Sequence, residues 1–216
     1  MSLELLETKA GEPSVGSGEP TLPPRADAAC GGPPEGPQGI LGDPARFGLL
    51  AFLGTVSMMF IGLTSAYLVR QTAPDWRPLP APPILWWNTA CLLLSSVVLE
   101  GARRGLRRVD LAAARRGLLA AGLLGLAFAA GQLQAWRILT GRGLSLASNP
   151  HSSFFYVLSG LHVLHLCGGL VWWAAAFHRL RRLAFPPGQD VLRLFATYWH
   201  FLAGLWLYLL YVLFVL

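Results

Sequence analysis

Five long apolar stretches limit what this chain can fold into. A helix needs about 20 apolar residues to cross the hydrocarbon core of a bilayer. The stretches cover, to within a few residues, 47–69, 84–100, 117–136, 153–177 and 194–216. They are continuously apolar and do not alternate, so they do not fit the strands of a membrane β-barrel. We therefore expect an all-α fold, a polytopic membrane bundle of five transmembrane helices.

The chain is too poor in charge for a soluble domain of this size. Only 13% of its residues are Asp, Glu, Lys or Arg, against about 25% in typical globular proteins. The acids beyond residue 45 are Asp75, Glu100, Asp110 and Asp190. The net charge of +6 does not indicate a nucleic-acid partner. The arginines fall in short loops between apolar stretches, and no groove-binding motif accompanies them.

The distribution of arginine predicts how the helices are oriented. The loops after the second and fourth stretches carry ten arginines, namely Arg103, Arg104, Arg107, Arg108, Arg115, Arg116, Arg179, Arg181, Arg182 and Arg193. The opposite loops carry only Arg70, Arg77, Arg137 and Arg142. Because cytoplasmic loops of membrane proteins are enriched in Arg and Lys, we expect the N-terminus in the cytoplasm and the C-terminus outside.

The first part of the chain differs in composition from the rest. Residues 1–45 are rich in Gly and Pro, contain no sustained apolar run and do not resemble a signal peptide. We expect them to form a disordered cytoplasmic tail, followed by a membrane domain over residues 46–216. The three cysteines, Cys30, Cys91 and Cys167, form no CxxC pair. They indicate neither a disulfide framework nor a dinuclear copper site.

Small residues recur where helices are expected to touch. Ala113, Gly117, Ala121, Gly125 and Ala129 form a ladder with a spacing of four residues down one face of the third helix. Such ladders allow neighbouring helix backbones to approach closely in a membrane. The expected positions of close helix packing are Gly117, Gly125, Gly160, Gly169 and Gly204.

Three histidines inside the apolar stretches are the main candidates for a site. His162 and His165 are three residues apart and share one face of the fourth helix, and His200 lies in the fifth. Together they are candidate metal or haem ligands. The favoured interpretation is that neutral imidazoles bridge between helices. Contact with a lipid headgroup or a partner subunit is a further alternative. The same helix-bracing or contact role is expected for Gln132, Tyr198 and Trp199.

No residue pattern points to catalysis within this chain. The sequence contains no nucleophile paired with a base, no P-loop and no dinucleotide fingerprint. The expectation from these residues is a packing subunit of a membrane complex, with no catalytic residue and no cofactor or metal of its own.

Five groups of motifs follow one another along the apolar stretches. They are Ser57–Gly62 with Ala66–Val69; Asn88-Thr89 with Leu92–Ser96; Leu124-Gly125 with Phe128 and Gln132–Trp136; Ser153–Phe155 with Ser159–His162, Leu164-His165 and Gly168 or Gly169; and Tyr198–Phe201 with Leu205–Leu207. In this order they resemble subunit III of the haem-copper terminal oxidases, the cytochrome c or quinol oxidase polypeptide III family, in its five-helix form. The resemblance covers roughly Phe47 to Leu216 and is strongest in the last two groups.

The resemblance implies a non-catalytic structural role in aerobic respiratory electron transport. The chain would bind beside the catalytic subunit I, together with subunit II, of a proton-pumping oxidase in the inner (plasma) membrane. Haem and copper would lie in those partner subunits, phospholipid would bind between helices, and the electron donor would be cytochrome c or quinol. Two alternatives stay open: a subunit III-like accessory protein of a nitric oxide reductase, and a stand-alone membrane transporter or enzyme.

Three positions depart from the family pattern. The family commonly has an acid at the position of Ser57, and often one near Ala135 and one near Ala203, whereas this chain is neutral at all three. The resemblance therefore carries over the structural role. It does not carry over roles that depend on those carboxylates, such as helping proton uptake.

Overall fold

The computed structural model describes residues 44–216, except residues 77, 80, 147 and 183–188. All described residues belong to one compact unit, Gln38–Leu216. Residues 1–43 of the expected disordered tail lie outside the described residues.

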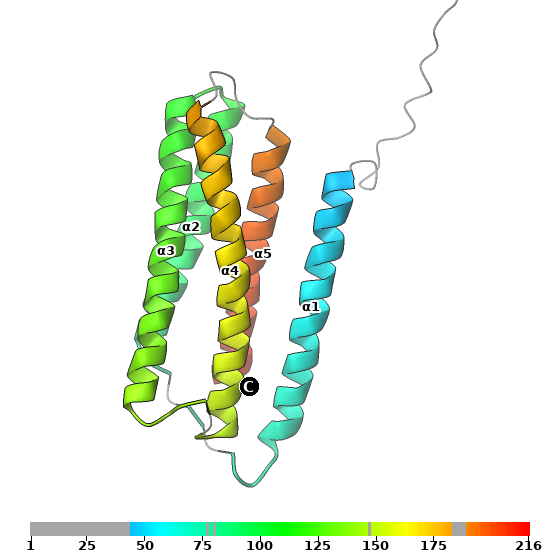
Figure 1. Ribbon diagram of the computed structural model, residues 1–216, viewed down its shortest axis with the longest axis vertical. Helices are drawn as coiled ribbons and strands as arrows, with labels where there is room; N and C mark the ends of the chain where they lie inside the picture. The colour runs from blue at the N-terminus through cyan, green and yellow to red at the C-terminus, as the bar shows by residue number, and fades with distance from the viewer. Residues whose placement is uncertain (1–43, 77, 80, 147, 183–188) are drawn as a thin grey trace, which may run out of the picture. The chain divides into compact units, whose positions relative to one another are not determined.

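Five helices make up the described part of the chain. They are α1 (Pro44–Gln71), α2 (Ile84–Arg107), α3 (Leu111–Gly141), α4 (Pro150–Arg182) and α5 (Gln189–Phe214) (Figure 1). All five are long and apolar enough to cross a membrane, and the described residues include no strand. The prediction of an all-α bundle of five membrane-spanning helices is confirmed.

Most helices extend beyond the apolar stretches that predicted them. The expected end of the second helix at Glu100 is wrong, because α2 continues to Arg107. Likewise α3 begins at Leu111, six residues before the expected start at Gly117, and the Asp110 carboxylate caps it by accepting a 2.9 Å hydrogen bond from the amide of Ala113. Arginine stems follow an apolar surface while their guanidinium groups reach water, so a helix does not have to end at its first charged residue.

The helices α2, α3, α4 and α5 pack in a ring. Helix α2 contacts α3 and α5, helix α4 contacts the same two, and α1 packs against α4 and α5. The side chains of Phe128, Phe155, Trp199 and Trp206 are fully buried in this bundle. Because the chain crosses the membrane an odd number of times, the start of α1 and the end of α5 lie on opposite sides of it. The direction of insertion stays a prediction from the arginine counts.

Some of the expected close-packing glycines lie against a neighbouring helix and others do not. A Cβ atom would lie 2.9 Å from the Ala102 Cβ if built on Gly117, 2.7 Å from the Trp199 ring on Gly125 and 3.0 Å from the Tyr198 ring on Gly169. A Cβ on Gly160 or Gly204 would meet no described atom within 4 Å. The expectation of close packing at Gly160 and Gly204 is therefore wrong within this chain, because neither faces a neighbouring helix closely.

Two glycines that the sequence analysis missed are the most crowded. A Cβ on Gly122 would lie 1.9 Å from Cε2 of Trp173, and a Cβ on Gly131 would lie 2.0 Å from Oδ1 of Asn88. At these two positions only a hydrogen atom fits beside the opposing side chain.

Candidate functional site: polar contacts between the helices

Two tryptophans tie α5 to α2. The indole Nε1–H of Trp199 donates a 2.6 Å hydrogen bond to Oγ of Ser95, and that of Trp206 donates a 3.0 Å hydrogen bond to Oγ1 of Thr89. Because the tryptophans are seven residues apart, they lie two turns apart on one helix face. Each ring is only 1% exposed. The seam between these helices thus combines large apolar rings with paired polar atoms.

Tyr198 makes the corresponding contact between α5 and α4. Its hydroxyl donates a 2.7 Å hydrogen bond to the backbone carbonyl of His165. The same ring lies over Gly169, where a Cβ would be only 3.0 Å from it. The absence of a side chain at Gly169 therefore lets the tyrosine reach the backbone of α4.

His162 and His165 serve different neighbours although they share a helix. The His162 ring is fully buried, with its centroid 5.8 Å from that of Phe128 and 5.1 Å from that of Trp206. His165 is half-buried, and its Nδ1–H donates a 2.7 Å hydrogen bond to the carbonyl of Leu161 in its own helix. Its ring lies 6.0 Å from Phe60 of α1, measured between centroids. No hydrogen bond of either ring joins two helices in the described residues, so the predicted bridging by these imidazoles rests on ring packing.

His200 also lies where α5 faces α2. Its Nε2 is 4.0 Å from Oε2 of Glu100, which lies within α2. Arg103 donates a 2.6 Å hydrogen bond to the same carboxylate. His200 therefore has a charged neighbour in α2, whereas the rings of His162 and His165 lie against aromatic side chains. Among the residues that the structure describes, no three or more His, Cys, Asp or Glu side chains form a group that could hold a metal ion.

The histidine that bridges most clearly, His151, was missed in the sequence. Its Nδ1 accepts a 3.0 Å hydrogen bond from the amide of Leu79, and its Nε2–H donates a 3.1 Å hydrogen bond to the carbonyl of Leu213. The ring also stacks on Trp76, with centroids 4.8 Å apart. One imidazole thus connects the segment between α1 and α2 with α4 and α5. The sequence signal is the proline at position 150, since proline favours the first turn of a helix and so places His151 inside α4.

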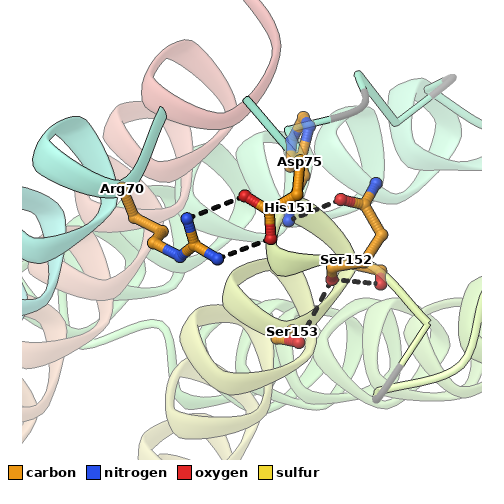
Figure 2. Close-up of polar contacts among 6 residues, drawn as sticks. Arg70, Asp75, His151, Ser152 and Ser153 are labelled. Atoms are coloured by element: carbon orange, nitrogen blue, oxygen red, sulfur yellow. Dashed lines mark hydrogen bonds and ion pairs between the residues drawn. The ribbon is translucent and has the colours of Figure 1, made fainter. Parts of the chain in front are cut away.

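An ion pair and a cavity lie near His151, between α1 and α4. Figure 2 shows the Arg70 guanidinium facing the Asp75 carboxylate, to which it donates hydrogen bonds of 2.8 and 2.6 Å. These bonds lower the pKa of the exposed Asp75 carboxyl below its usual value. The adjacent cavity has a volume of about 1140 Å³. Its lining includes Gly62, Ser65, Ala66, Val69, Arg70, Ala73, Asp75, Ser148, Asn149, Pro150, Ser153 and Phe154.

Gln132 and the three positions without the family acids are the other residues that the sequence singled out. Gln132 is fully buried in α3, and its Oε1 accepts a long, 3.5 Å hydrogen bond from Nδ2 of Asn88 in α2. Ala135 and Ala203 are buried, at 0% and 4% exposure. The Ser57 hydroxyl donates a 2.8 Å hydrogen bond to the carbonyl of Leu53 in its own helix. At the three positions where the family often has an acid, this chain thus has two small buried side chains and one hydroxyl that donates a hydrogen bond to the backbone of its own helix.

Comparison with known proteins identifies the family. The sequence model of the family described as "Cytochrome c oxidase subunit III" matches residues 40–216. The chain belongs to this family. The match covers all five helices of this subunit III, and includes every residue of the polar contacts described above.

Curated relatives agree with that assignment. A "Probable cytochrome c oxidase subunit 3" of Mycobacterium tuberculosis (strain ATCC 25618 / H37Rv) is 30% identical over 173 residues, covering 77% of this chain and 85% of that protein. The "Cytochrome c oxidase subunit 3" of Synechocystis sp. is 30% identical over 181 residues, covering 81% and 76%. That of Gallus gallus is 28% identical over 176 residues, covering 76% and 66%. The chain is a subunit III of a haem-copper oxidase, and the nitric oxide reductase and transporter alternatives are not favoured.

Proposed function

We propose that this subunit III is a non-catalytic structural component that binds beside the catalytic subunit I and subunit II of a proton-pumping oxidase. The complex would lie in the cell's inner (plasma) membrane and take part in aerobic respiration, with haem and copper in the partner subunits. The names of the relatives support cytochrome c as the electron donor. The arginine distribution supports an orientation with the N-terminus in the cytoplasm.

One observation carries the structural part of the proposal. Three pairs of polar side chains join α2 and α5: Trp199 bonds Ser95, Trp206 bonds Thr89, and His200 lies near Glu100. Polar groups in a bilayer either find partners or mark ion pathways and cofactor sites. Side chains that are already paired between helices hold the bundle together, which is the role of a packing subunit.

The test is to isolate the tagged chain from its own membranes in mild detergent. We expect oxidase subunits to accompany it, together with a haem spectrum. After separation from those subunits, the chain should contain no stoichiometric haem, copper or zinc in metal analysis. Metal that the separated chain retains, and that is lost on His162→Ala or His165→Ala, would contradict the structural role.

We also propose that the cavity between α1 and α4 binds the headgroup region of a phospholipid. Its lining combines the charged pair Arg70 and Asp75 and the polar start of α4 with apolar side chains such as Val69 and Phe154. A phospholipid presents the same combination, a phosphate beside acyl chains. Arg70 supplies a positive charge for the phosphate, since the guanidinium carries more donors than its two bonds to Asp75 use.

Arg70→Gln should lower the phospholipid content of the purified complex. The substitution removes the cation and leaves the Asp75 carboxylate to repel a phosphate, so repeated detergent washes should remove lipid several-fold faster. Lipid phosphorus per haem measures the effect. Arg142→Gln is the control, because Arg142 is exposed at the end of α3, on the same side of the bundle. Asp75→Asn, which keeps the cation, should leave the lipid content unchanged; loss of lipid in Asp75→Asn but not in Arg70→Gln would contradict the proposal.

A further inference from the structure

The side chains of His162 and Gln132, buried among helices α2 to α5, carry nitrogen atoms without a hydrogen-bond partner in the described residues. Neither ring nitrogen of His162 has a hydrogen-bond partner among the described residues. The amide nitrogen Nε2 of Gln132 has none either. Both side chains are 0% exposed. A buried donor without a partner is costly, and such groups in folded proteins are nearly always bonded to protein or to ordered water.

The contacts between α3 and α4 place these two side chains in one layer. The Phe128 ring of α3 touches the His162 ring of α4, with centroids 5.8 Å apart. Two turns further along α3, the Trp136 indole donates a 3.1 Å hydrogen bond to Oγ of Ser159. Gln132 is one turn from both Phe128 and Trp136, and His162 is one turn from Ser159. Because i and i+4 residues share a helix face, Gln132 faces the same gap between α3 and α4 as His162.

The polar side chains on either side of this layer do not provide the missing hydrogen bonds. On one side, Asn88 reaches only Oε1 of Gln132, at 3.5 Å, and so leaves the amide Nε2 without an acceptor. On the other side, the Trp206 indole donates its only N–H to Thr89 and offers His162 only a ring face.

A water molecule has the bonding groups that this layer lacks. A neutral imidazole offers one N–H donor and one acceptor nitrogen, and the free Nε2 of Gln132 offers donors only. A water accepts from the amide and also donates to the acceptor nitrogen of an imidazole, and buried waters typically make about three such bonds. Charge on the ring would be costly at this depth, which favours the neutral form that needs both kinds of partner.

We propose that the core between α2, α3, α4 and α5 binds ordered water that connects Gln132 of α3 with His162 of α4. The water is a structural ligand of this subunit, and it completes a polar path from Asn88 through Gln132 to His162. It gives the buried histidine a hydrogen bond to a neighbouring helix, in addition to the contacts that its ring makes with Phe128 and Trp206.

A density map of the intact oxidase tests the proposal directly. At a resolution that shows ordered water elsewhere in the complex, we expect a water peak within hydrogen-bond distance of both Nε2 of Gln132 and a ring nitrogen of His162. A direct bond between the two side chains, or no peak in this layer, overturns the proposal.

Substitutions give a second, independent measurement. Gln132→Leu and His162→Phe each remove one partner of the water, and the double variant removes both. We expect each single variant to lower the temperature at which the subunit leaves the complex, and the double variant to lower it by less than the sum, because the second change removes a partner that has already lost its water. Strictly additive shifts overturn the proposal. The matched controls are Gln134→Leu and His178→Phe, whose side chains are exposed on the same two helices and should change little. If His162→Phe does not assemble, the map of the wild-type complex still decides.

Discussion

Gly122→Ala should remove most of this subunit III from the purified oxidase. The added Cβ would lie 1.9 Å from Cε2 of Trp173, so the indole ring or the α3 backbone has to move. The ring is not free to turn away, because its Nε1–H donates a 2.7 Å hydrogen bond to the carbonyl of Leu118 and its face stacks on Phe177, with centroids 5.8 Å apart. Overpacking of this kind costs about 1–3 kcal/mol, and in a membrane it separates backbones that depend on contact for their association.

Gly160→Ala is the matched control for this effect. It makes the same chemical change in a neighbouring helix, but its Cβ would meet no described atom within 4 Å. The measurement is the amount of subunit III per haem in complexes purified through a tag on the catalytic subunit. Equal loss in both variants would mean that crowding against Trp173 does not decide the outcome. Full retention of Gly122→Ala would mean that Trp173 can rearrange at little cost.

The number and type of helices followed from the sequence because a bilayer sets a length for each apolar run. Their ends did not follow, since hydropathy falls at the first arginine whereas the backbone of α2 continues to Arg107. A helix end is set by capping and by side chains that reach water, as at Asp110, and these are local features that a hydropathy average does not contain.

The contacts between helices were only partly predictable for a different reason. A ladder such as Gly117 and Gly125 reveals that one helix face is small, but it does not reveal which side chain fills the opposite side. Gly122 and Gly131 are crowded because Trp173 and Asn88 point at them from two different helices. One sequence shows the spacing along a helix and not the rotation of its neighbours.

The histidines show the same limit. His162 and His165 stood out because they interrupt an apolar stretch, and the structure places both at helix contacts. His151 did not stand out, because it follows a polar turn and lies before the expected start of the fourth helix. Its role depends on Leu79 and Leu213, which are 72 and 62 residues away along the chain.

Trp199→Ala should weaken the attachment of α5 more than any of the histidine substitutions. The Trp199 ring is 1% exposed and fills the space above Gly125 and Gly169, where Cβ atoms would lie 2.7 and 3.3 Å from it. The same ring donates the 2.6 Å hydrogen bond to Ser95. Replacing a buried tryptophan with alanine costs about 3–5 kcal/mol in well-packed cores, and the hydroxyl of Ser95 also loses its donor.

The packing and hydrogen-bond contributions of Trp199 can be separated. Trp199→Phe keeps most of the ring but removes the donor, so it should cost about 1–3 kcal/mol, the scale for leaving one buried polar atom unpaired. Combining it with Ser95→Ala should recover part of that loss, because no unpaired hydroxyl then remains. Trp86→Ala is the control, since the Trp86 side chain is 68% exposed and contributes little to the bundle.

The prediction for Trp199→Ala is tested by measuring subunit III content and turnover per haem on the same purified complexes. As Trp199→Ala complexes are warmed, subunit III should leave at a lower temperature than in wild type, and turnover per haem in the catalytic core that remains should change less than subunit content. That order follows if Trp199 braces helices and touches neither electrons nor oxygen. A complex that keeps all of its subunit III and lipid but loses turnover would assign the α2–α5 seam a part in the chemistry of the oxidase, and it would contradict the structural role proposed for this chain.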